Sequence, residues 1–281
     1  MRADVVHRVG AALGGEVSEI RTIAGGDVSD AYAVTVAGAT FFVKVNDDAP
    51  SGMFAAEAHG LGWLAQAKAV RVPRVIAVGE DFIALEWLER GPRGRGFDET
   101  LGRGLATLHR AAPDGFGLDR DNFIATLAQH NQPAPTWAEF WVWRRLEPMV
   151  RRAIDRRGAP ARWSVALERL AVQLPELSGP AEPVARLHGD LWHGNVHAAG
   201  GEPALIDPAV YGGHREVDLA MLALFGGLSD ALVAAYQEVW PLAPGWRERI
   251  PLWQLYPLLV HVALFGGGYV AQTERAIASI V

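Results

Sequence analysis

Three polar residues in the second half of the sequence stand at a spacing that suits chemistry on a bound substrate. Asp190 is followed five positions later by Asn195, and Asp207 ends the apolar run 204–206. Phosphoryl transfer from ATP needs one carboxylate to orient and deprotonate the accepting hydroxyl, and an amide and a second carboxylate to hold Mg²⁺. We therefore expect Asp190 to act as the base, with Asn195 and Asp207 as the metal ligands.

The order of these residues is that of a kinase catalytic loop. Gly189 replaces the arginine that protein kinases carry at that place, and Pro208 follows the second carboxylate. Both replacements point away from protein kinases. The alternative is a glycine-rich turn in which Asp190 and Asn195 only cap backbone amides. A nucleotide-binding lobe upstream would decide between the two interpretations.

The first ninety residues have the pattern of such a lobe. Apolar residues at helical spacing predict a helix over 4–13, which Gly14 and Gly15 end. The pattern then changes to short β-rich runs separated by turn residues. These runs predict antiparallel strands over 17–23, 32–36, 40–45, 75–78 and 82–85.

Lys44 and Glu57 are assigned together. Lys44 lies on the third expected strand, and Glu57 follows in a helix expected over 51–67. In a kinase lobe, a helix glutamate pairs with the strand lysine that reaches the phosphates. The alternative is that both side chains are simply exposed. Gly25 and Gly26 would let backbone N–H groups approach the phosphates, although most such pairs are plain hairpin turns.

The segment after the fifth strand is expected to meet the adenine edge through its backbone. Glu86, Trp87 and Leu88 occupy this hinge position, and a run rich in Gly, Arg and Pro follows them. We therefore divide the chain into a nucleotide-binding lobe, 1–90, and a catalytic and substrate-binding lobe, 91–281. The hinge assignment rests on position, because backbone recognition leaves little side-chain signature.

The rest of the chain predicts a larger, mostly helical lobe. Helices are expected over 98–110, 137–157, 161–174 and 229–239, from about 216, and from 252 onward. The run 116–123 is interpreted as a polar loop with aromatic edges, and His109 and Asp218 as structural residues. The predicted fold class is α+β, with a small antiparallel sheet lobe and its helix preceding the helical lobe.

Composition argues against several classes of function. The formal net charge of −6 does not suit a nucleic-acid partner. Without cysteine there is no disulfide framework, and the N-terminal residues lack the apolar core of a signal peptide. The uncharged run 250–270 has the length of a membrane span, but its Pro, Gln, His and Gly residues favour a buried helix. We expect a cytoplasmic protein with no membrane partner.

Several runs resemble the fructosamine (ketosamine-3) kinase family, and the similarity spans nearly the whole chain. They are 188–195, 205–221, 256–261, 265–269, and the shorter 42–44 and 117–124. The run Asp-Pro-Ala-Val-Tyr-Gly-Gly-His-Arg-Glu at 207–216 is the most discriminating. Aminoglycoside and choline kinases share the catalytic loop in looser form but lack this run.

The resemblance implies a protein-kinase-like bilobal fold and ATP- and Mg²⁺-dependent phosphorylation of the sugar 3-hydroxyl of ketosamines, a deglycation reaction. It implies the same roles for the lysine, acids and amide named above, and a substrate pocket that includes Trp192, Asp121 and His214. The family often has Ser at the position of His193, which we expect to face solvent.

Two rival interpretations remain beside this one. One is another small-molecule kinase of the same fold, acting on an aminoglycoside or an amino alcohol. The other is a catalytically silent nucleotide-binding module. The expected substrate is a free or protein-bound ketosamine, and the expected state is a monomer or weak dimer.

Overall fold

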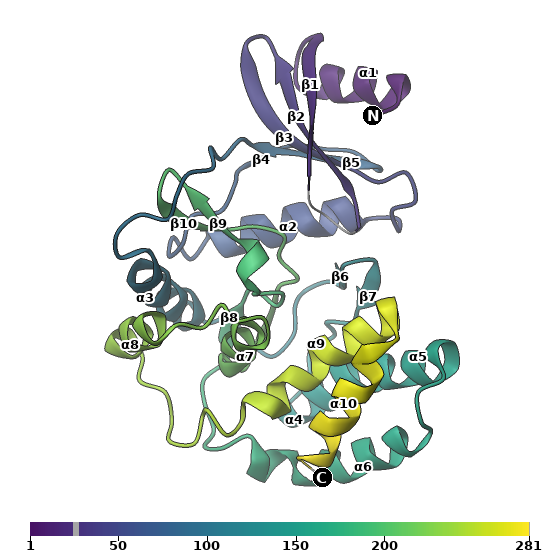
Figure 1. The fold of residues 1–281 in the computed structure, drawn as a ribbon, viewed down its shortest axis with the longest axis vertical. Coiled ribbons are helices and arrows are strands. Elements are labelled where there is room, and N and C mark those ends of the chain that lie inside the picture. The colour runs from purple at the N-terminus through teal and green to yellow at the C-terminus, as the bar shows by residue number, and fades with distance from the viewer. Residues whose placement is uncertain (25–27, 281) are drawn as a thin grey trace.

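The computed structural model describes residues 1–24 and 28–280 and shows a small β lobe above a larger helical lobe (Figure 1). The fold is α+β and bilobal, as the sequence predicts. Five antiparallel strands form the sheet of the small lobe in the order β1-β2-β3-β5-β4. The elements of this lobe are α1 Ala3–Ala12, β1 Val17–Ile23, β2 Asp30–Val36, β3 Ala39–Val45, α2 Met53–Ala65, β4 Val75–Val78 and β5 Phe82–Glu86.

The two helices of the small lobe cover opposite faces of its sheet (Figure 1). Val5 and Val9 of α1 pack in one cluster with Val43 of β3. Successive side chains of a strand point to opposite faces, so Lys44 projects toward α2. The pleat of β3 thereby directs this lysine at the helix that carries Glu57.

A segment without regular structure, 87–96, connects the lobes and is fastened to the hairpin that follows the catalytic loop. The Gly91 N–H donates to the Ala198 carbonyl at 3.0 Å, and the Gly94 N–H donates to the Gly201 carbonyl at 2.9 Å. The division at residues 90 and 91 falls inside this segment, and we keep it as a proposal.

The large lobe, as far as the structure describes it, consists of helices with three short strand pairs among them (Figure 1). Its elements are α3 Phe97–Arg110, β6 Asn122–Ile124, β7 Leu127–Gln129, α4 Trp137–Phe140, the π-helix η1 Trp141–Leu146, α5 Glu147–Arg157, α6 Arg162–Leu177, β8 Ala185–Leu187, the 3₁₀ turn η2 His193–Asn195, β9 Val196–Ala199, β10 Glu202–Leu205, β11 Tyr211–Gly213, α7 Glu216–Leu224, α8 Asp230–Val239, α9 Ile250–Phe265 and α10 Gly268–Ala278.

Two expectations for this lobe were wrong in detail. The run 116–123 is not only a loop, because its end forms β6 and pairs with β7 as a hairpin. The helix expected over 137–157 is interrupted by the π-helical turn η1. Short strands such as β6 carry too few residues for a period-2 signal, and a π turn has no distinct sequence pattern.

The core of the large lobe is rich in aromatic residues. Trp137, Phe140 and Trp141 are nearly or fully buried, and Trp253 of α9 packs against the two tryptophans. Helix α9 is apolar on all sides and is buried accordingly. The late uncharged run is thus a core helix, followed by α10.

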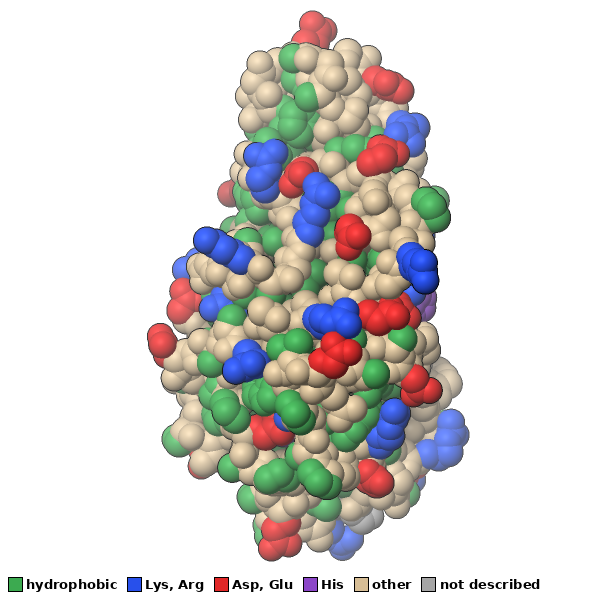
Figure 2. Space-filling view, turned by 90° about the vertical axis from the view of Figure 1, so that its left-hand side faces the viewer, with side chains coloured by type: hydrophobic (Ala, Val, Ile, Leu, Met, Phe, Trp, Pro, Cys, Tyr) green, Lys and Arg blue, Asp and Glu red, His purple; other side chains and the backbone are tan. Residues whose placement is uncertain are grey.

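Within the described residues, none of the helices is both long and apolar enough to cross a bilayer. On the face shown in Figure 2, basic and acidic side chains are interspersed and no broad basic patch gathers.

Candidate active site

Two short strand pairs in the large lobe carry the catalytic segment. Asp190 lies between β8 and β9, Asn195 ends the turn η2, and Asp207 lies between β10 and β11. The Asn195 amide nitrogen donates to the Asp190 carbonyl at 2.8 Å and to its carboxylate at 3.1 Å, and it lies 3.4 Å from the Asp207 carbonyl. The structure therefore brings together the three residues singled out by spacing.

Lys44 links the small lobe to this segment. Its Nζ donates to Glu57 Oε1 at 2.8 Å and to Asp207 Oδ1 at 2.5 Å. Burial opposes the charge of Lys44, but the carboxylates of Asp207 and Glu57 outweigh burial and hold the pKa of Lys44 above its usual value. Burial also raises the pKa of Glu57, against the opposing effect of Lys44. Lys44 is therefore protonated at neutral pH, as a phosphate contact requires.

Asp190 has an unusually high proton affinity for a carboxylate. Burial, followed by repulsion from Asp207, raises its pKa to about 7, although the hydrogen bond from Asn195 acts in the opposite direction. A general base works best when its pKa lies near the operating pH. Carboxylates with strongly shifted pKa values also tend to mark functional sites.

Asp218 holds the catalytic loop from behind. Its two carboxylate oxygens accept the His188 N–H at 2.7 Å and the Gly189 N–H at 3.0 Å. His109 Nε2 lies 3.2 Å from the same carboxylate, and its other ring nitrogen lies 2.8 Å from the Tyr236 hydroxyl. Both His109 and Asp218 were interpreted as structural from the sequence. The structure shows that Asp218, with His109 behind it, supports the loop that carries Asp190, the proposed base.

The glycine before Asp190 is required by close packing. Gly189 has φ +82°, and a Cβ there would lie 2.0 Å from the Ala209 carbonyl oxygen. No side chain fits between the loop and this backbone. The absence of the protein-kinase arginine thus has a steric cause in this fold.

A row of aromatic side chains leads away from Asp190, starting two positions after it. Ring centroids are separated by 5.9 Å for Trp192 and Phe225, 5.4 Å for Phe225 and His261, and 4.8 Å for His261 and Tyr269. Phe265, which is 53% exposed, lies 5.8 Å from His261. We call these five residues the aromatic row. Its ring faces can attract a cation such as a protonated amine.

Only Trp192 of the aromatic row was named from the sequence. The runs 256–261 and 265–269 were noted there without a role, and Phe225 was missed. The remaining members come from the end of α7, from α9 and from α10. The row therefore depends on how these helices converge, which local sequence patterns do not show. His193 is exposed, as expected, and its ring stands edge-on to Trp192 at 5.0 Å.

Two residues expected in the substrate pocket have other surroundings. Asp121 caps the β6–β7 hairpin, because its carboxylate accepts the Asn131 N–H and pairs with His130, each at 2.8 Å. His214 is buried and stacks on Trp253 at a centroid distance of 4.9 Å. Its burial in the core argues against direct contact with a substrate, and we do not carry it into the proposed site.

The side chains of the predicted hinge are engaged in local contacts. Glu86 pairs with Arg71 at 2.9 Å, and the indole N–H of Trp87 donates to Glu89 at 2.7 Å. The carbonyl of Leu88 lies 3.1 Å from His197 Nε2. An adenine contact through this segment remains a prediction. Gly25 and Gly26, the predicted phosphate loop, lie outside the described residues.

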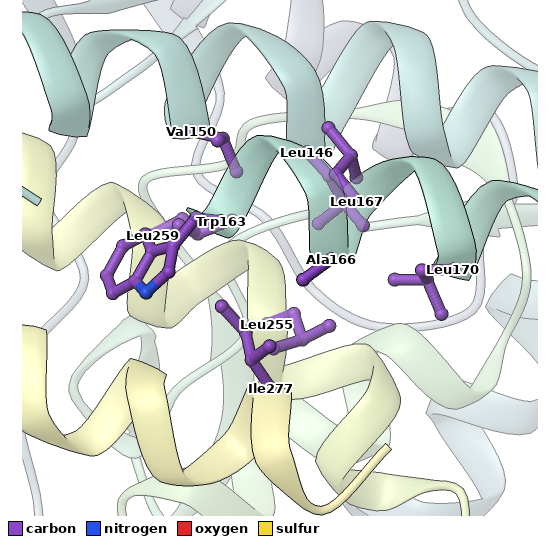
Figure 3. Close-up of a pocket in the computed structure, with 9 residues that line it drawn as sticks. All are labelled: Leu146, Val150, Trp163, Ala166, Leu167, Leu170, Leu255, Leu259 and Ile277. Carbon is purple, nitrogen blue, oxygen red and sulfur yellow. The ribbon is translucent and has the colours of Figure 1, made fainter. Parts of the chain in front are cut away.

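A small, partly open cavity lies in the helical core, and none of its lining residues belongs to the predicted site. Its volume of about 20 Å³ suits no more than a single water molecule. Apolar side chains of η1, α5, α6, α9 and α10 point into it (Figure 3). It is lined by Leu146, Val150, Trp163, Ala166, Leu167, Leu170, Leu255, Leu259 and Ile277. This cavity is too small and too apolar to be the substrate site.

The donor atoms of the catalytic segment would suit a magnesium ion that takes only part of its ligand shell from the protein. The nitrogen of the Asn195 amide is used within the segment, which leaves its carbonyl oxygen for a cation, and the Asp207 side chain is 40% exposed. Among the described residues, no three His, Cys, Asp or Glu side chains gather as a metal site. Kinase sites typically bind Mg²⁺ through one or two protein oxygens, with phosphate oxygens and water completing the shell.

Comparison with known proteins places this geometry in a family. A family model described as fructosamine kinase matches residues 2–281. The chain belongs to the fructosamine kinase family. A probable ketoamine kinase of Thermus thermophilus is 40% identical over 258 residues, which cover 91% of each chain. The chloroplastic protein-ribulosamine 3-kinase of Oryza sativa subsp. japonica is 35% identical over 262 residues, 90% of this chain and 76% of that one.

Solved structures agree with the family and extend the fold likeness beyond it. A Thermobifida fusca protein assigned as a fructosamine-3-kinase superposes with a TM-score of 0.91 at 42% identity, covering 100% of this chain and 99% of that one. The choline kinase of Streptococcus pneumoniae reaches a TM-score of 0.67 at 13% identity over 99% of this chain and 97% of that one, which shows the shared fold alone. As a family member with this kinase-like fold, the chain is an ATP-dependent phosphotransferase.

Proposed function

We propose that this enzyme phosphorylates the 3-hydroxyl of the sugar in ketosamines, the rearranged adducts of sugars with amines. The observation that carries the proposal is the surroundings of Asp190. Asn195 donates to its carboxylate, Asp207, which pairs with Lys44, raises its pKa, and Trp192 of the aromatic row follows two positions later in the chain. Phosphate and sugar–amine chemistry would thus meet at a single carboxylate.

The residues on the nucleotide side have separate tasks. Lys44, fixed by Glu57, would bind phosphate oxygens, and Asn195 and Asp207 would hold Mg²⁺. When bound, Mg-ATP supplies the phosphoryl group and the counter-charge for the negative charge on the transferring oxygens. These residues contribute mainly by positioning and by electrostatic stabilisation.

Asp190 acts on the acceptor. Its carboxylate would accept a hydrogen bond from the attacking hydroxyl and orient the oxygen toward the γ-phosphorus. As the new bond to phosphorus forms and the bond to the leaving ADP oxygen breaks, the hydroxyl proton passes to Asp190. A pKa near 7 suits this transfer at neutral pH.

The aromatic row would bind the acceptor. Trp192, two positions after Asp190, would cover a face of the sugar, and the rings beyond it would contact the amine portion. A ketosamine nitrogen is protonated at neutral pH and is attracted to ring faces. This arrangement supports an amine-bearing sugar more directly than an uncharged one.

The test is a substrate panel with purified enzyme and Mg-ATP. It contains ribulose-lysine, fructose-lysine, kanamycin and choline, and it is read by ADP release, product mass and phosphorus-proton NMR correlation. We expect a ketosamine product carrying phosphate on O3. Phosphorylation of kanamycin or choline alone would contradict the proposed substrate, phosphate on another oxygen would contradict the proposed position, and no transfer to any acceptor would favour the silent module.

A further inference from the structure

The hairpin β6–β7 contacts the catalytic segment through two buried amides. Asn122 Nδ2 donates to the Val210 carbonyl at 2.8 Å, and Gln129 Nε2 donates to the Ala209 carbonyl at 3.0 Å. Asn122 is 4% exposed and Gln129 is 1% exposed. Their two acceptors follow Asp207 in the chain by two and three positions. The hairpin thus binds the backbone just beyond the carboxylate assigned to Mg²⁺.

The orientation of both amides is fixed by further hydrogen bonds. Asn122 Oδ1 accepts from Gln129 Nε2 and from Asn131 Nδ2, each at 2.8 Å. Gln129 Oε1 accepts the Tyr256 hydroxyl at 2.8 Å. Rotating either amide by half a turn would place oxygen against a carbonyl oxygen and lose these bonds. A fully connected buried network of this kind specifies one geometry.

The network ends at a buried arginine. Arg145 donates to the Asn131 side-chain oxygen at 2.5 Å and to the His130 carbonyl at 2.6 Å. It is fully buried, it belongs to the π-helix η1, and among the described residues it pairs with no carboxylate within 4.0 Å. The rings of Phe140, Tyr211 and Tyr256 also face its guanidinium. Because its hydrogen-bond acceptors are all neutral oxygens, losing them would leave a buried charge poorly compensated, so the guanidinium holds them firmly.

Asp207 needs this kind of support. Its φ of +56° lies in the left-handed region, which few residues other than glycine adopt, and a proline follows it. Such a backbone persists only where its surroundings over-determine it. On the upstream side, the Ile206 N–H donates to the Asn195 carbonyl at 3.1 Å. Downstream, the Ala209 N–H donates to His188, and the two hairpin amides hold the carbonyls that follow.

We propose that Asn122 and Gln129 are positioning residues that hold the strained turn at Asp207 and so direct its carboxylate to the metal. Both side chains are buried, so they would act through the turn and not by direct contact with substrate or nucleotide. The hairpin, whose first residues were interpreted as a loop, becomes part of the catalytic apparatus. This inference rests on the proposed role of Asp207 as a magnesium ligand.

The test measures ADP binding by calorimetry, first in EDTA and then with saturating Mg²⁺. The ratio of the two dissociation constants gives the magnesium enhancement of ADP affinity, a binding quantity that is independent of turnover. Q129M removes both donated hydrogen bonds. The matched control is Q254M, because Gln254 Nε2 also donates to a backbone carbonyl at 3.0 Å, that of Ala220 in α7.

We expect Q129M to lower the magnesium enhancement about tenfold while leaving ADP affinity in EDTA within about twofold of wild type. Q254M should keep the wild-type enhancement even if it lowers the melting temperature equally. An unchanged enhancement in Q129M would overturn the inference. If Q129M does not fold, N122S replaces it, because serine is too short to reach the Val210 carbonyl.

The outcomes separate this inference from the proposed function. If Mg²⁺ changes the ADP affinity of neither wild type nor D207N, the assignment of Asp207 to the metal fails. If wild type shows the enhancement, D207N loses it and Q129M keeps it, the site stands and only the positioning role is refuted.

Discussion

Asp190, which is partly buried, and Asp218, which is fully buried, are both carboxylates of the catalytic region, yet their pKa values are shifted in opposite directions. Burial tends to raise both. Asp218 receives two backbone N–H groups and His109, which together lower its pKa. Asp190 receives Asn195 and is repelled by Asp207, and its pKa rises to about 7.

The difference shows that burial alone does not decide what a carboxylate does. Where hydrogen-bond donors satisfy the charge, the group is ionised and serves as a structural anchor. Where donors are few and another negative charge lies near, the group holds a proton more tightly and can exchange it near neutral pH. The destabilised carboxylate is the one suited to catalysis.

The largest expected effect is on turnover, and it distinguishes Asp190 from Asp218. D190N should lower kcat by about 10²-fold or more, because an amide cannot accept the hydroxyl proton, while ADP affinity stays near wild type. Steady-state kinetics on a ketosamine and calorimetry with Mg-ADP check both parts. A turnover near that of wild type would refute the assignment of Asp190 as the base.

Removing the charge of Asp218 should instead damage the fold. D218N keeps the shape but weakens the bonds to the His188 and Gly189 N–H groups and to His109, so we expect a loss of about 2–4 kcal/mol in unfolding free energy. Urea unfolding at pH 8 measures it. A stability equal to wild type would mean that the loop does not depend on this anchor.

In the absence of Mg²⁺, the stability differences of the two variants from wild type should have opposite signs at pH 8 and should depend differently on pH. The raised pKa of Asp190 means that its charged form costs stability as pH rises through about 7. D190N should therefore be more stable than wild type by about 1–3 kcal/mol at pH 8, with the gain vanishing near pH 4.

Asp218 gives the contrasting profile. Its lowered pKa means that its stabilising effect is complete above its ordinary value of 3.8 and is lost only as pH falls below that. The deficit of D218N should accordingly persist from pH 8 to about pH 4. Unfolding curves in EDTA across this range would contradict the comparison if both variants changed in the same direction.

The smallest effect concerns the partner of Asp218. H109Q should cost about 1 kcal/mol, since it loses hydrogen bonds to Asp218 and Tyr236 while both backbone N–H bonds to Asp218 remain. Thermal unfolding at neutral pH is sufficient to measure it. A deficit as large as that of D218N would show that the stabilising effect of Asp218 depends on His109 and not on the two backbone N–H bonds.

Much of the fold followed from local patterns. The five strands of the small lobe and its two helices were predicted because apolar periodicity and turn residues are properties of short windows. The contact of Lys44 with Glu57 was expected because a strand lysine and a helix glutamate at that spacing have few other arrangements in a kinase lobe. Asp190, Asn195 and Asp207 were found because a short loop and one hairpin separate them.

The sequence by itself thus determined the two lobes, the kind of chemistry and the residues nearest the proposed reaction. Tertiary structure alone decided the aromatic row, the anchoring of the catalytic loop by Asp218, and the hold of Asn122 and Gln129 on residues 80 or more positions away. Helix convergence cannot be predicted from any single helix. An amide that binds a backbone carbonyl leaves no partner to find in the sequence, because every residue carries that carbonyl.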